Sequence, residues 1–60
     1  MNDTIERLAR CIAGDLEMAE RAYLQKRMDK MAVYLSSAQS FANQLLEEIE
    51  YQKYQNRISA

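Results

Sequence analysis

The chain contains no proline and a single glycine, Gly14, among its 60 residues. These two residue types most disfavour a helix interior, by about 3 and about 1 kcal/mol relative to alanine. The rest of the sequence is rich in Ala, Leu, Met, Glu, Gln, Lys and Arg, which lose little conformational freedom in a helix. No strand-like alternation and no Asn-Gly or Asp-Gly pair occurs. The sequence therefore predicts an all-α protein, with residues 1–60 as a single small helical domain.

Two apolar stripes follow helical spacing. The first contains Ile5, Leu8, Ile12, Leu16, Ala19 and Tyr23. The second contains Leu24, Met28, Met31, Leu35, Ala38, Ala42, Leu45 and Ile49. Its spacings alternate between four and three residues, which is the heptad pattern of a helix–helix seam. We predict that the second stripe is a seam through which copies of the chain associate.

The two stripes are out of phase by roughly 100° on one straight helix, so a turn between them is expected. Gly14 followed by Asp15 has the character of a helix end and a new helix start. We predict a short helix over about residues 3–13 that turns at Gly14 into a long helix over about residues 15–57. Two alternatives remain: an unbroken helix, because Leu16 stays in phase with Ile12, and a break at Ser36–Ser37.

A core formed by this chain alone would be only marginally stable. A folded chain of this size buries only about 60% of its unfolded surface, and small domains usually add disulfides, a metal or oligomerisation. A single cysteine, Cys11, excludes an internal disulfide, and the chain has no histidine for a metal site. We therefore expect a homo-oligomer, most simply a homodimer.

Charge distribution favours an antiparallel dimer. Residues 31–46 carry no charge, although 28% of the chain is charged. Basic residues precede this neutral stretch and acidic residues follow it: Arg21, Lys26, Arg27 and Lys30, then Glu47, Glu48 and Glu50. Antiparallel packing centred near Ala38 would bring opposite charges together, whereas parallel packing would stack like charges.

A second protein would have to bind outside the seam. Polar residues on the outer face of the neutral stretch and tyrosines near the C-terminus are the candidates for this contact: Ser40, Asn43, Gln44, Tyr51 and Tyr54. Charge is depleted at interface cores, and tyrosine is enriched among the residues that dominate binding energy.

The sequence offers no catalytic constellation. Without histidine the commonest general base is missing, and Cys11 has no histidine to activate it. No metal, phosphate or cofactor motif occurs, so we predict no enzyme activity and no cofactor. No apolar run approaches the roughly 20 residues of a membrane span, and the free cysteine fits a reducing compartment, so we expect a cytoplasmic protein.

The leading functional hypothesis is a non-enzymatic helical homo-oligomer that binds and modulates a larger protein, as an inhibitor or adaptor. Its size and class are those of small phage- or plasmid-encoded regulators, which is an analogy of class alone. The alternative is a small RNA- or DNA-binding regulator that uses Arg21, Lys26, Arg27 and Lys30. A formal net charge of −1 disfavours nucleic acid as the partner.

Overall fold

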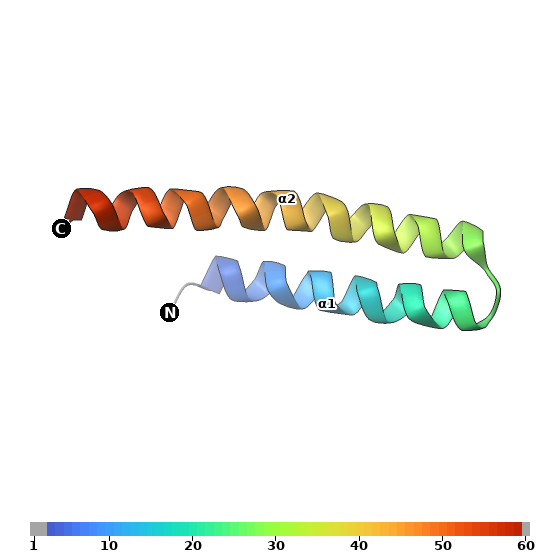
Figure 1. Cartoon of the computed structure of the whole chain (residues 1–60). Helices are drawn as coiled ribbons and strands as arrows, with labels where there is room; N and C mark the ends of the chain where they lie inside the picture. Colours follow the sequence, from blue (N-terminus) through green and yellow to red (C-terminus); the bar gives the residue numbers. More distant parts are fainter. Residues whose placement is uncertain (1–2, 60) are drawn as a thin grey trace.

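The computed structural model describes the backbone of residues 3–59 and the side chains of residues 3–55. It consists of two α-helices, α1 (Asp3–Leu24) and α2 (Met28–Ser59), that pack against each other as an antiparallel hairpin (Figure 1). No strand occurs in residues 3–59. The predicted all-α fold is confirmed, and the hairpin is elongated, with extents of 50 × 17 × 11 Å.

The turn lies at residues 25–27, so the prediction of a turn at Gly14 is wrong. The two alternatives, an unbroken helix and a break at Ser36–Ser37, are wrong as well. Gly14 is an exposed residue inside α1 without a positive φ, and nothing lies within 4 Å of the position that a Cβ would occupy. Glycine there destabilises the helix by about 1 kcal/mol. Breaking the helix would cost more, because its inner face continues in phase from Ile12 to Ala19.

The turn is built without glycine or proline. Lys26 adopts a φ of 58°, in the left-handed region. Its N–H donates to the carbonyl of Tyr23 at 2.9 Å, and the N–H of Arg27 donates to the carbonyl of Ala22 at 2.8 Å. These two bonds form a Schellman motif, which normally has glycine at the left-handed position. They satisfy carbonyls at the end of α1 and reverse the chain within three residues.

Arg27 links the turn to the start of α2. Its carbonyl accepts the N–H of Met31 at 3.0 Å, and its guanidinium donates from Nε and Nη2 to the two carboxylate oxygens of Asp29, each at 3.3 Å. The hydrogen bond from Arg27, followed by one from the backbone N–H of Lys30, lowers the pKa of Asp29 below its ordinary value. The carboxylate also lies in the first turn of α2, where the helix dipole favours negative charge.

The contact between the helices forms a thin core. Among the described residues, the buried apolar side chains are Leu8, Ala19, Ala22 and Ala38. Three of these four are alanines, which let two helices approach closely but remove little apolar area from water. Larger side chains beside them, such as Ile12, Phe41 and Leu45, are only half-buried. The hairpin alone therefore gains little from hydrophobic burial.

A carboxylate interrupts the inner face of α1. Asp15 follows Ile12 by three residues and precedes Ala19 by four, so it lies on the side of α1 that packs on α2. Its Oδ2 atom is buried and has no hydrogen-bond partner. Counting outward from the turn places Asp15 about level with Ser37 and Ala38 of α2. A buried acceptor without a donor destabilises a fold by about 1–3 kcal/mol.

Replacing the left-handed lysine should stabilise the hairpin. Lys26→Gly removes the Cβ that makes a φ of 58° unfavourable, so the free energy of unfolding should rise by about 1 kcal/mol. Chemical denaturation followed by circular dichroism measures the change. The control is Lys30→Gly inside α2, which should destabilise by a similar amount. A destabilised Lys26→Gly variant would contradict the proposed turn.

Removing the orphaned carboxylate should also stabilise the fold. Asp15→Ala should raise the free energy of unfolding by about 1–3 kcal/mol. In the wild type, Oδ2 gives up its hydrogen bonds to water on folding and gains none in the folded chain, and the variant removes this penalty. Part of this gain would arise because alanine is a better helix former than aspartate. The exposed neighbouring position 14 measures that part, as the difference in stability between Gly14→Ala and Gly14→Asp. The gain at position 15 should exceed the Asp-to-Ala difference at position 14. Equal or smaller gains would mean that the carboxylate carries no burial penalty.

Candidate interaction surfaces

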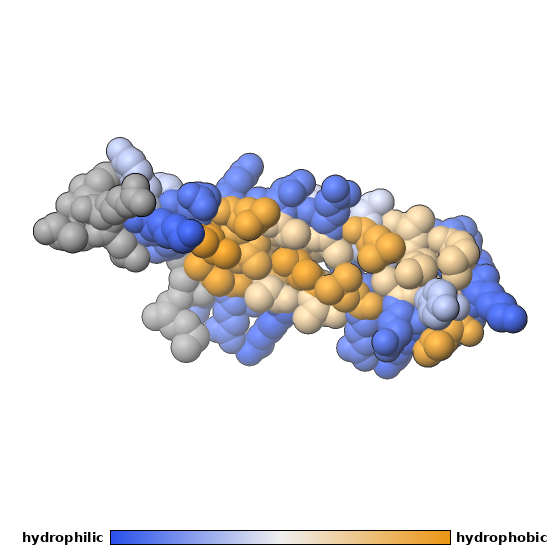
Figure 2. All heavy atoms as spheres, in the orientation of Figure 1, coloured by the Kyte–Doolittle hydropathy of each residue, from blue (hydrophilic) through white to orange (hydrophobic). Residues whose placement is uncertain are grey.

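An apolar groove lies between the helices on one side of the hairpin. It is lined by Leu16, Ala19, Glu20, Tyr23, Met31 and Leu35. Leu16 of α1 and Leu35 of α2 remain 49% and 41% exposed although they lie at the contact between the helices. Figure 2 shows a band of apolar side chains along the middle of the viewed face, with hydrophilic side chains above and below it.

The apolar character continues along α2 beyond the groove. Met28, Leu35, Ala42 and Ile49 follow one another at intervals of seven residues, and two helical turns bring such residues back to the same side. Leu46 lies between the last two and is exposed. We call this surface, with the groove, the apolar band. Exposed apolar side chains that lie together in this way are typical of an interaction surface.

The predicted oligomer seam is divided by the observed turn. Leu24 ends α1 and Met28 begins α2, so the seam does not run along one helix as predicted. Ala38 is buried against α1 and is not open to another copy, whereas Leu24, Met28 and Leu35 are exposed. The remaining members are half-buried: Met31, Ala42, Leu45 and Ile49. The involvement of these residues in association stays a prediction, and Leu16 and Tyr23 of α1 join them on the apolar band.

The C-terminal part of α2 projects beyond α1. Both helices leave the turn together, but α2 has 32 residues and α1 has 22 (Figure 1). Tyr51 and Tyr54 lie on this projecting part and are 57% and 62% exposed. They line a shallow depression together with Glu47, Glu50 and Lys53. The two tyrosines are therefore accessible to another molecule.

The other predicted contact residues lie on the outside of the hairpin. Ser40, Asn43 and Gln44 are exposed on α2, as expected for an outer face. Their role in binding stays a prediction.

The basic residues gather near the turn, and two of the four are engaged in ion pairs. Arg21 contacts Glu17 at 3.2 Å, and Arg27 contacts Asp29 at 3.3 Å. Both pairs are exposed, where such pairs contribute about 0–1 kcal/mol. In each pair, however, a carboxylate occupies a guanidinium group that would otherwise be available to bind a phosphate.

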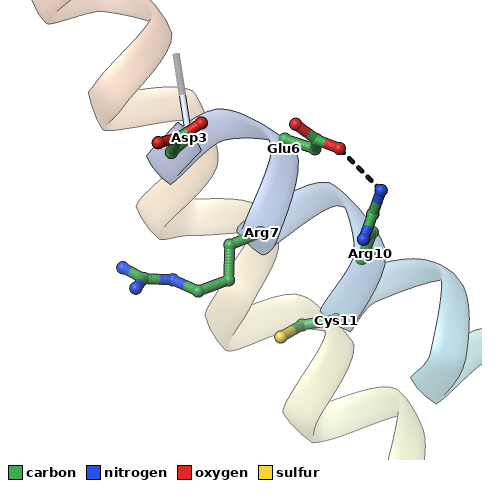
Figure 3. Close-up of a pocket in the computed structure, with 5 residues that line it drawn as sticks. All are labelled: Asp3, Glu6, Arg7, Arg10 and Cys11. Atoms are coloured by element: carbon green, nitrogen blue, oxygen red, sulfur yellow. Dashed lines mark hydrogen bonds and ion pairs between the residues drawn. The ribbon is translucent and has the colours of Figure 1, made fainter.

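Cys11 is half-buried in the N-terminal half of α1. It borders a shallow depression with Asp3, Glu6, Arg7 and Arg10. Figure 3 shows the guanidinium of Arg10 directed at Glu6, to which it donates at 2.6 Å, and away from the sulfur. Within residues 3–55 no group of three Cys, Asp or Glu residues is placed to hold a metal ion.

Comparison with known proteins gives no relative. No family model, no curated protein and no solved structure matches the chain. Over the part of the chain that the structure describes, neither helix has an apolar run long enough to cross a membrane.

Proposed function

We propose that the chain is a non-enzymatic, cytoplasmic protein that self-associates and binds a larger protein, which it modulates as an inhibitor or adaptor. The observation that carries the proposal is the pair of exposed tyrosines, Tyr51 and Tyr54, on the part of α2 that projects beyond α1. A projecting helix end can enter a groove or lie on a surface of another protein without clashing with its own hairpin.

The chemistry of this helix end suits a protein partner. Tyrosine supplies a large contact area at a low cost in side-chain entropy, and it is enriched among residues that dominate protein interfaces. Glu47, Glu50 and Lys53 surround the tyrosines and would form a polar rim. Ser40, Asn43 and Gln44 extend the same contact along the outer side of α2.

Nucleic acid is the less favoured partner. Phosphate binding requires cations that are not already matched by carboxylates, yet Arg21 and Arg27 pair with Glu17 and Asp29. The formal net charge of −1 also opposes a long-range attraction to nucleic acid.

A tyrosine double variant tests the protein-binding proposal. The wild-type chain first captures its partner from nuclease-treated lysate, and the purified partner is then titrated against variants by calorimetry. Tyr51→Ala with Tyr54→Ala should weaken binding by about 2 kcal/mol or more, because both anchors are lost. The matched control, Tyr51→Phe with Tyr54→Phe, keeps the rings and should bind much more tightly than the alanine variant.

Charge reversal provides the opposing test. Changing Lys26, Arg27 and Lys30 to Glu should affect partner binding less than the loss of the two tyrosines. If the charge reversal abolishes binding while the alanine variant binds as the wild type does, the protein-binding proposal fails. A parallel capture from lysate without nuclease that yields nucleic acid with a steep salt dependence would then support the RNA- or DNA-binding alternative.

A further inference from the structure

The hairpin leaves large apolar side chains open to solvent on one side of the helix pair. Leu16, Tyr23 and Leu35 are 49%, 58% and 41% exposed, and Leu46, farther along the same side of α2, is 60% exposed. Exposed apolar side chains that lie together are typical of a surface that another molecule covers.

The apolar band is the part of the surface that such a molecule would cover. Its groove combines Leu16 and Tyr23 of α1 with Met31 and Leu35 of α2. Glu20 is the charged residue among those lining the groove. A nearly uncharged apolar surface along both helices of a hairpin is the geometry of one half of a four-helix bundle.

We propose that a second copy of the chain covers the apolar band, so that two hairpins form an antiparallel four-helix bundle. The inference deepens the self-association part of the proposed function. Two identical apolar surfaces are complementary under a two-fold axis, because each residue meets the matching patch of the other copy.

Charge favours the antiparallel orientation. Near the turn, Arg21 and Arg27 pair with Glu17 and Asp29, and Lys26 and Lys30 keep residues 21–30 basic. Residues 47–50 contain three glutamates, one of which, Glu50, contacts Lys53 at 3.9 Å. If the two α2 helices pack antiparallel with the axis near Ala38, the acidic segment of one copy lies beside the basic turn of the other. Turn-to-turn packing would place the basic segments together.

Sedimentation equilibrium tests whether two copies associate through the apolar band. The wild type should sediment as a dimer of the 7.0 kDa chain, and Leu35→Arg should weaken association at least 100-fold, because it places a charge in the centre of the interface. The matched control is Val33→Arg, since Val33 is 66% exposed and lines a different surface with Asp29, Lys30 and Tyr34. This control should change association by less than about threefold, because rim charges contribute little. A monomeric wild type, or equal effects of the two arginines, would overturn the inference.

Disulfide trapping tests the orientation without perturbing the interface by a charge. Gln39 follows Leu35 by four residues, so it lies on the side of α2 that carries the apolar band and close to the proposed axis. In a Cys11→Ser background, Gln39→Cys should form a disulfide-linked dimer on mild oxidation, whereas Ser40→Cys on the outer side should not. Equal trapping at both positions, or none at position 39, would overturn the antiparallel bundle. Either failure leaves the tyrosine titration unaffected, so the two proposals are separable.

Discussion

The small apolar area that two helices can bury between themselves governs the rest of this structure. A hairpin offers each helix one neighbour, and here the buried side chains of the described residues are one leucine and three alanines. Alanines let the helices approach closely, but they contribute little hydrophobic free energy. The larger apolar residues, among them Leu16, Tyr23 and Leu35, consequently remain at the edge of the contact. They form an apolar surface that the described residues cover only in part.

Two local features add to this constraint. The turn places Lys26 in a left-handed conformation that glycine would adopt more easily, and the inner face of α1 carries the buried, unpartnered Oδ2 of Asp15. Both lower the stability of an isolated hairpin. The proposed second copy would supply the apolar contact that the isolated hairpin lacks. In the proposed dimer, association and folding form one equilibrium.

The sequence predicted the helical class because proline is absent and helix formers dominate throughout. It did not predict the turn, because its strongest local signal, Gly14, lies at an exposed helix position where the cost of glycine is small. The observed turn at Lys26 has no glycine or proline. It is held by backbone hydrogen bonds, which any residue type can form and which therefore leave no signal in the sequence. The misplaced turn also assigned Ala38 to an intermolecular seam, whereas α1 covers it.

The candidate surfaces were partly visible in the sequence. The predicted seam includes Met28, Leu35, Ala42 and Ile49, and the structure leaves the first two exposed and the last two half-buried. Their role in association stays a prediction. The contribution of Leu16 and Tyr23 to the apolar band could not be predicted without the position of the turn, because residues of α1 lie beside the α2 stripe only after the chain reverses at residues 25–27. The position of Asp15 on the inner face could not be predicted for the same reason.

The concentration dependence of thermal unfolding tests the central claim, that the hairpin depends on a second copy to cover its apolar band. Melting curves followed by circular dichroism over a hundredfold range of protein concentration give the result directly. Tm should rise steadily with concentration, because dissociation accompanies unfolding. A Tm that is independent of concentration, together with a folded species of 7.0 kDa throughout, would contradict it.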